Sequence, residues 1–194
     1  VEEKWPEIHQ LVDNKKAYLL FGDEASFPQW GRLSYTWAIK GKQPVVKTSC
    51  DRKGYKVFGL IDYFSGRFFY KGREGKLNSE SYAAYLKEVL SKIRKHIILI
   101  QDGAKYHTSN AMKTFFSKHS KRITVFQLPS YSPDFNPIEK LWKKIKEKDT
   151  HMHYFPTFET LKNKVIETLL RFENVQSDIL ALFGFYREME EKPL

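Results

Sequence analysis

Short apolar runs alternate with stretches of helical periodicity along this chain of 194 residues. The sequence AYLLFGD at residues 17–23 is almost continuously apolar and ends at an acid, which predicts a buried strand. Residues 24–50 are rich in Trp, Gly and Pro and predict a loop. Two further strands are predicted over residues 56–63 and 67–71, joined by the turn Phe64-Ser65-Gly66 as a hairpin.

Helices alternate with strands in the rest of the pattern. Apolar residues recur at spacings of three and four from Ser79 to Lys95, which predicts an amphipathic helix. The sequence HIILIQD at residues 96–102 predicts a second buried strand that ends at an acid. A further strand is predicted over residues 123–128. The other predicted helices cover residues 109–119, 138–148, 158–172 and 175–189.

This order of elements predicts the fold class. An antiparallel hairpin followed by alternating helices and strands indicates an α/β fold, with a mixed five-stranded sheet flanked by helices. Three antiparallel strands followed by two parallel strands is the order of the ribonuclease-H-like fold. The length fits one domain, and neither an internal repeat nor a linker divides the chain. Fold alone does not identify the chemistry.

Composition excludes several classes of protein. Hydrophobic residues make up 41% and aromatic residues 15%, which excludes a disordered, collagen-like or coiled-coil chain. No apolar run approaches the roughly 20 residues that cross a bilayer, so no membrane partner is expected. The single cysteine, Cys50, excludes an intramolecular disulfide and a cysteine-built zinc site.

Positive charge is concentrated in the middle of the chain. The net charge is +10, with +6 in residues 51–100 and +5 in residues 101–150. Such a basic region predicts a polyanionic partner, with nucleic acid first, although a lysine-rich soluble surface has the same composition.

Two acids follow predicted strands, Asp23 and Asp102. If these strands are adjacent and parallel, their carboxyl ends meet at one edge of the sheet, where ligand sites form. Two carboxylates there repel each other unless one is protonated or a cation lies between them. Their hard oxygen ligands suit Mg²⁺ or Mn²⁺. Turns also favour aspartate, so each acid has a structural alternative.

A third carboxylate, Glu139, falls in the first turn of the helix that opens with Asn136-Pro137. This turn faces the loop end of the sheet, from which Glu139 can reach the two aspartates. The same residues also match a capping box, with Asn136 as N-cap and Glu139 at the third helical position. Three other acids compete for the role of metal ligand: Glu24, Asp62 and Asp134.

Basic residues near these acids are candidate DNA contacts. Lys105 and His107 follow the second aspartate and can contact a phosphate. His107 can instead position a metal ligand, or make only a local hydrogen bond. The helix over residues 138–148 carries Lys140, Lys143 and Lys144 among its lysines, which form either a solvated face or a contact with the DNA backbone.

Four segments then occur in order: LLFGDEASF, TWAIKGKQPVV, ILIQDGAKYHTS and LPSYSPDFNPIEKLWKKIK, all within residues 19–146. Together they resemble the catalytic domain of transposases of the IS630/Tc1/mariner superfamily. The second segment leans towards the IS630 branch, and the last is the most specific. The chain departs from the family pattern at Gly103, where asparagine is frequent, and at Ser130, where a second proline is usual.

The resemblance implies a ribonuclease-H-like fold and an acidic triad, which falls on Asp23, Asp102 and Glu139. It also implies two Mg²⁺ or Mn²⁺ ions held by that triad. These ions activate water or a DNA 3′-hydroxyl for in-line displacement at phosphorus. Cleavage at transposon ends and strand transfer into target DNA, with TA as the target, are then one reaction with different nucleophiles. A homodimer acting on paired ends is implied as well.

Such transposases also carry an N-terminal helix-turn-helix region that binds the ends of the element. Residues 1–18 match no such region, so we expect residues 1–194 to be a single catalytic domain without it. Double-stranded DNA as partner implies the cytoplasm or nucleoid of a prokaryote or the nucleus of a eukaryote. Two alternatives remain open: a metal-dependent nuclease of the same fold without strand transfer, and a domesticated DNA-binding domain without catalysis.

Overall fold

One mixed sheet forms the centre of the computed structural model, which describes residues 4–30, 37–42, 45, 47–129, 135–184 and 186. Its five strands lie in the order β3-β2-β1-β4-β5. They are β1 (Tyr18–Pro28), β2 (Gly54–Asp62), β3 (Phe68–Arg73), β4 (Ile97–Gln101) and β5 (Ile123–Gln127). The first three strands pair antiparallel, and β4 and β5 continue in parallel from β1. The predicted mixed sheet is therefore confirmed.

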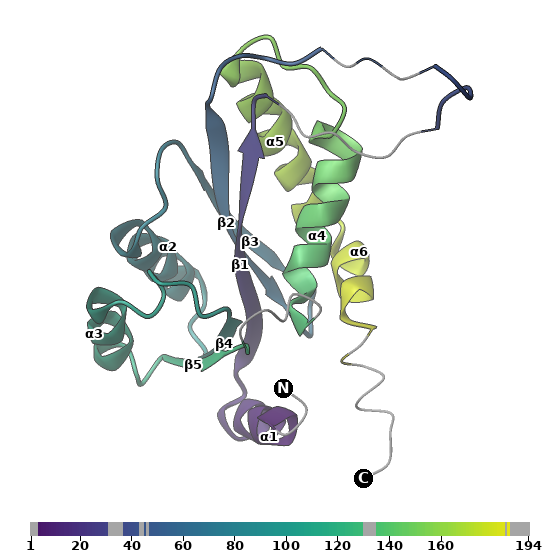
Figure 1. Ribbon diagram of the computed structural model, residues 1–194. Coiled ribbons are helices and arrows are strands. Elements are labelled where there is room, and N and C mark those ends of the chain that lie inside the picture. The colour runs from purple at the N-terminus through teal and green to yellow at the C-terminus, as the bar shows by residue number, and fades with distance from the viewer. Residues whose placement is uncertain are drawn as a thin grey trace.

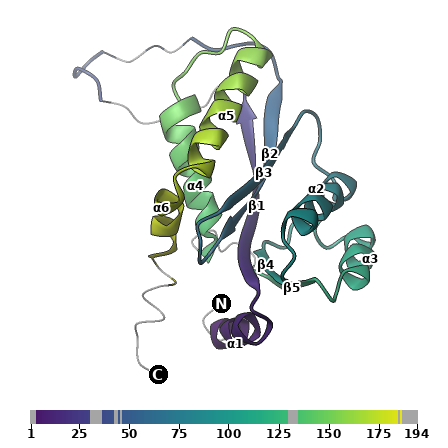
Figure 2. The same ribbon diagram turned by 180° about the vertical axis from the view of Figure 1, so that it is seen from behind.

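Helices cover both faces of this sheet (Figure 1 and Figure 2). One face carries α2 (Ser79–Lys92) and α3 (Asn110–Lys118). The opposite face carries α4 (Pro137–Ile145), α5 (Phe158–Glu173) and α6 (Gln176–Leu180). A π-helical turn, Lys146–Thr150, extends α4, and a 3₁₀ turn, Ala181–Phe183, follows α6. Within the described residues, no helix is long and apolar enough to cross a membrane.

Alternation along β1 divides the hydrophobic core between the two faces. Phe21 belongs to the cluster beneath α4, α5 and α6, whereas its neighbour Leu20 belongs to the cluster beneath α2. This pattern arises because successive side chains of a strand point to opposite faces. Asp23 and Glu24, further along the same strand, therefore project to opposite faces as well.

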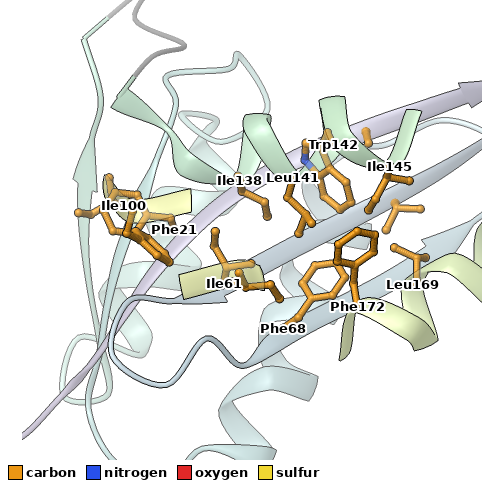
Figure 3. Close-up of a cluster of buried hydrophobic side chains, with 14 of the residues drawn as sticks. Phe21, Ile61, Phe68, Ile100, Ile138, Leu141, Trp142, Ile145, Leu169 and Phe172 are labelled. Carbon is orange, nitrogen blue, oxygen red and sulfur yellow. The ribbon is translucent and has the colours of Figure 1, made fainter. Parts of the chain in front are cut away.

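The buried stripe of α4 fixes that helix against the sheet. Its members are Ile138, Leu141, Trp142 and Ile145, all with exposed fractions of 3% or less. Figure 3 shows this stripe directed at strand residues such as Ile61 and Phe68, with Phe172 and Leu169 of α5 beside Phe68 and Ile145. The stripe thereby determines where the polar side chains on the rest of α4 lie.

Two parts of the fold differ from the sequence prediction. The strand β1 runs on to Pro28, because its antiparallel pairing with β2 extends to Pro28 and Gly54. Parallel pairing with β4 stops earlier, at Gly22 and Gln101. The prediction that β1 ends at Asp23 and that residues 24–28 are loop is therefore wrong.

The second difference lies at the two ends of the chain. A helix that the sequence reading did not assign, α1, covers Trp5–Lys15 and buries Trp5, Ile8 and Val12. Trp5 packs on the ring of Tyr186 at a centroid distance of 4.4 Å. The helix predicted over residues 175–189 is interrupted, since α6 ends at Leu180. Residues 185 and 187–194 lie outside the described part of the chain.

Candidate active site

The two aspartates meet where the parallel pairing of the sheet ends. The strands β1 and β4 are adjacent and parallel, and their last paired residues are Gly22 and Gln101. Asp23 and Asp102 are the next residues on each strand. Asp23 lies in the middle of β1, because β1 continues past Gly22 by pairing with β2 alone. It is still next to the carboxyl end of β4, where the pairing of β1 with β4 stops.

Glu139 is placed by a contact between α4 and β1. Asn136, the residue before α4, donates a hydrogen bond from Nδ2 to the carbonyl oxygen of Gly22 at 3.0 Å. Pro137 occupies the first turn, as predicted, but the Asn136 side chain makes no helix-capping hydrogen bond. Asn136 is the N-cap residue, but the capping box that was the structural alternative for Glu139 is not formed. The amide of Asn136 instead ties the first turn of α4, which contains Glu139, to the residue before Asp23.

A pocket of about 430 Å³ brings Asp23 and Glu139 together. Its lining also includes Glu24, Trp142, Lys143, Lys146 and His151. A larger pocket of about 610 Å³ lies at the edge strand β3. The larger pocket is lined by none of the three predicted acids, whereas the smaller one is lined by two of them, since Asp102 is not among its lining residues.

Burial and neighbouring acids act strongly on Asp23. Burial, together with the negative charges of Glu24, Glu139 and Asp102, raises the pKa of Asp23 from 3.8 to about 8. Three other carboxylates therefore lie close enough to repel a negative charge on Asp23. Without a cation, this aspartate is a proton-binding group near neutral pH.

The donor set suits a hard divalent cation. Among the described residues, no three His, Cys, Asp or Glu side chains are already arranged around one cation position. Carboxylate oxygens are nevertheless the preferred ligands of Mg²⁺ and Mn²⁺. A cation between Asp23, Asp102 and Glu139 relieves the repulsion that raises the Asp23 pKa. The donor chemistry of the three side chains therefore fits such an ion.

His107 joins two acids of this region. Its ring nitrogens contact Asp102 and Glu24, with Nδ1 2.9 Å from Asp102 Oδ1 and Nε2 2.7 Å from Glu24 Oε1. Burial lowers the His107 pKa, but hydrogen bonds to the two carboxylates outweigh it and raise the pKa to about 9. The resulting imidazolium donates from both nitrogens.

The contact with His107 also makes the pKa of Asp102 differ from that of Asp23. The hydrogen bond from His107 lowers the Asp102 pKa below its ordinary value, and the amide of Ala104 acts in the same direction. Asp23 is shifted the other way. The pair therefore holds one carboxylate that is ionised and one that needs a proton or a cation, a difference set entirely by their surroundings.

The competing acids have other roles or lie elsewhere. Asp62 ends β2 and pairs with Leu20, which precedes Asp23 on β1. Its Oδ2 accepts hydrogen bonds from the amide and hydroxyl of Ser65, so Asp62 stabilises the turn after β2. Glu24 lies beside the triad but is bonded to His107. Asp134 is outside the described residues.

The predicted DNA contacts separate into two groups. Lys105 and Lys140 are exposed, and Lys143 lines the acidic pocket with 75% of its side chain exposed. Lys144 pairs with Asp178 at 2.8 Å instead and does not line that pocket. His107 is only 1% exposed with both nitrogens engaged, which corrects the prediction that it contacts DNA directly. Its geometry agrees with the alternative, the positioning of an acid.

His151 of this pocket was not predicted from the sequence, and Lys146 is one of the lysines of the helix predicted over residues 138–148. The signal for Lys146 is present in the helical spacing, because residues 139, 143 and 146 lie on one face at intervals of four and three. His151 follows the π-helical turn Lys146–Thr150, which no sequence pattern indicates.

The sequence of this chain is similar to a known protein family and to proteins of two mobile elements, IS630 and Tc3. The protein family described as DDE superfamily endonuclease matches residues 18–162. The IS630 uncharacterized 39 kDa protein of Shigella sonnei is 26% identical over 168 residues, which are 84% of this chain and 48% of that protein. The Tc3 transposase of Caenorhabditis elegans is 29% identical over 163 residues, 77% of this chain and 47% of that protein. The chain thus spans about half the length of the curated relatives it matches.

Solved structures of the Mos1 mariner transposase share the fold. A paired-end complex with Mn aligns with a TM-score of 0.65 and 14% identity, over 100% of this chain and 62% of that one. The isolated Mos1 catalytic domain aligns with a TM-score of 0.54 and 14% identity, over 93% of this chain and 90% of that one. The ribonuclease-H-like fold expected from the strand order is therefore confirmed.

Proposed function

This chain belongs to the DDE superfamily of endonucleases, as a catalytic domain of the IS630/Tc1/mariner type, and on that premise we propose that Asp23, Asp102 and Glu139 form its catalytic triad. The proposed reaction is metal-dependent cleavage of DNA strands at transposon ends, followed by strand transfer into target DNA. Both steps are in-line displacements at phosphorus, one with water and the other with a DNA 3′-hydroxyl as nucleophile.

The observation that carries this proposal is the raised pKa of Asp23 at the end of the β1–β4 pairing. Buried carboxylates are costly to collect in one place, and a purely structural role would be met better by neutral side chains. Such a cluster is therefore the mark of a site that binds cations. Two Mg²⁺ or Mn²⁺ ions would supply an activated nucleophile and stabilise the leaving oxygen when bound.

The chain's own residues have separate tasks in this reaction. Asp23 is held by the sheet, and Asp102 is oriented by its bonds to His107 and the Ala104 amide. Glu139 approaches from the other side, on a helix anchored by Asn136. These are the three groups that would hold the metal ions.

Lysines allow a polyanion to approach this acidic pocket. Lys143 and Lys146 line it together with the carboxylates. Their positive charge would attract a DNA phosphate to the point where the metal ions act, and the basic region of residues 51–150 would hold the flanking backbone. Lys105 and Lys140 are proposed as backbone contacts from the neighbouring loop and helix.

The partners of the reaction are proposals that rest on the relatives. Solved Mos1 structures are described as paired-end complexes with the left transposon end, with Mg and with Mn. For this chain we propose double-stranded DNA as substrate, a TA target, and a homodimer as the active assembly.

A strand-transfer assay tests the proposed function. The chain is incubated with Mn²⁺, pre-cleaved ends of its own element and a plasmid target. Joined products support the transposase. Cleavage of uncut ends without joining would favour a nuclease of the same fold, and DNA binding without either reaction would favour a non-catalytic DNA-binding domain.

A further inference from the structure

We propose that His107 and Glu24 form a positioning pair that sets the orientation of the Asp102 carboxylate relative to Asp23. In this role neither side chain binds the metal ion or the substrate. It rests on the proposed function, because it takes Asp102 to be a ligand of the catalytic metal. The pair acts through hydrogen bonds that connect two strands at the edge of the site.

The first support is the bridge itself. Glu24 is the residue after Asp23 on β1, and Asp102 is the residue after β4. His107 contacts both, at 2.7 Å and 2.9 Å, from the loop before α3. The bridge therefore joins the strand that carries one catalytic aspartate to the other catalytic aspartate.

The second support is that the ring of His107 cannot readily turn. It packs against two aromatic rings, with centroid distances of 4.5 Å to Tyr82 and 4.3 Å to Tyr106. Tyr82 is itself held by a hydrogen bond to Gln101 Oε1 at 2.5 Å. The backbone amide of His107 donates to the carbonyl of Ala104 at 2.9 Å. A side chain packed in this way has a single orientation in which both of its nitrogens are used.

The third support is that the two hydrogen bonds to the Asp102 carboxylate are made to the same oxygen. His107 Nδ1 and the Ala104 amide both bond to Oδ1, at 2.9 Å and 3.2 Å. The carboxylate side chain is 47% exposed, so it still faces the solvent of the site. With Oδ1 engaged from the protein side, Oδ2 is the oxygen left to a metal ion. Hydrogen bonds of this kind orient metal-binding carboxylates and contribute to metal affinity.

Charge and positioning predict opposite results for His107→Gln. A positively charged imidazolium beside the site repels a cation, and a neutral imidazole has no net effect on it. Loss of the ring therefore cannot weaken cation binding through charge. Weaker Mn²⁺ binding in this variant reports a loss of orientation instead.

The experiment measures Mn²⁺ binding to the protein without DNA, by electron paramagnetic resonance, together with the melting temperature. We expect His107→Gln to weaken Mn²⁺ binding by about 10- to 100-fold, the range found for outer-shell partners of metal ligands. The matched control is His96→Gln, which removes a histidine bonded to Thr124 at the other end of β4. The control should leave Mn²⁺ affinity unchanged.

A double-mutant cycle separates the pair from direct charge effects of Glu24. If Glu24 acts through His107, Glu24→Gln should have little further effect in the His107→Gln background. If the two substitutions instead lower Mn²⁺ affinity by independent factors that multiply in the double variant, Glu24 acts on the metal directly, and this would overturn the pair. Mn²⁺ affinity of His107→Gln within twofold of the unmodified chain would overturn it as well.

A structure of the unmodified chain with Mn²⁺ covers the case in which His107→Gln does not fold. Asp102 should bind the ion through Oδ2 and keep Oδ1 on His107, and an ion that displaces His107 from Oδ1 would overturn the inference. Failure of the proposed function is distinguishable, because then the unmodified chain itself would bind no Mn²⁺ and cut no DNA.

Discussion

Asn136 donates a hydrogen bond from its side-chain amide to the carbonyl oxygen of Gly22, and this 3.0 Å contact joins the start of α4 to the strand residue before Asp23. Asn136 is only 1% exposed. The contact therefore couples the two elements that carry Glu139 and Asp23 within a dry part of the structure, where a lost hydrogen bond is costly.

Replacement of Asn136 by Ala should lower both stability and DNA cleavage. The Gly22 carbonyl would lose its donor, which costs about 1–3 kcal/mol of unfolding free energy. Cleavage should fall further than the folded fraction does, because Glu139 moves with the start of α4. Asn174→Ala is the control, since Asn174 also donates to a carbonyl but at the exposed end of α5. Normal cleavage by folded Asn136→Ala protein would show that α4 is placed without this bond.

The close approach of α4 to β2 gives a second prediction. A Cβ atom on Gly59 would lie 2.5 Å from Trp142 and 2.9 Å from Ile138. Gly59→Ala should therefore force α4 outward and cost about 1–3 kcal/mol. In a chain of this size each kcal/mol lowers the melting temperature by roughly 2–4 °C. Gly103→Ala is the thermal control, because nothing lies within 4 Å of its added Cβ. Equal melting temperatures for the two variants would contradict the packing described for α4.

Loss of one triad carboxylate should stop the chemistry but not DNA binding. Asp102→Asn removes the charge and keeps the side-chain shape, so we expect cleavage in Mn²⁺ to fall by more than the roughly 10- to 100-fold typical of outer-shell changes. Gel-shift affinity should remain. Asp62→Asn is the matched control, because Asp62 belongs to the turn after β2. Cleavage by Asp102→Asn at the normal rate would refute the triad.

Stability without metal should depend on pH through Asp23. Its pKa rises from 3.8 to about 8 on folding, so between these values the folded protein holds a proton that the unfolded chain releases. The stabilising contribution is present below about pH 4 and is lost as the pH rises through about 8. Asp23→Asn should thus melt at a higher temperature than the unmodified chain in EDTA, by a margin that grows with pH. A constant margin would contradict the raised pKa, and Mn²⁺ should stabilise only the unmodified chain strongly.

The two neighbouring lysines of α4 should differ in DNA binding. Lys143 lines the acidic pocket, whereas Lys144 pairs with Asp178 and lies 5.7 Å over the ring of Phe172. Lys143→Gln should weaken binding and reduce the slope of log affinity against log salt by about 1, the value for one lost phosphate contact. Lys144→Gln should leave that slope unchanged. Equal slopes for both variants would place the DNA elsewhere.

Local pattern was sufficient to predict most of the sheet and to select the acids that we propose as the triad. Strands such as β4 are buried on both faces, so their sequences are apolar throughout and end visibly at a polar residue such as Asp102. The stripe of α4 was equally visible, because its burial follows the helical period. Whether an element is buried on one face or on both is reflected in the spacing of its own apolar residues, so it can be predicted from the local sequence.

The errors arose where a neighbouring element decided the outcome. The sequence DEASFP at residues 23–28 is too polar to indicate a buried strand, yet pairing with β2 extends β1 through it. The side-chain amide of Asn136 donates to the carbonyl of Gly22 on β1 and makes no capping bond to α4. The residues match the capping pattern, but the contact they make is with another element. Glu24 was visible only as a competing acid until the ring of His107 was found against it.

By itself, the sequence determined the candidate residues for the proposed chemistry: the acids that follow buried strands, the helix that carries Glu139 and the basic middle of the chain. Only the tertiary structure decided which of these acids lie near one another, that burial raises the pKa of Asp23 while hydrogen bonds lower that of Asp102, and that His107 is a buried bridge. The reason is physical. Burial leaves its mark in local composition, whereas distance and pKa depend on groups that the strand pairing and the docking of α4 bring together from remote parts of the chain.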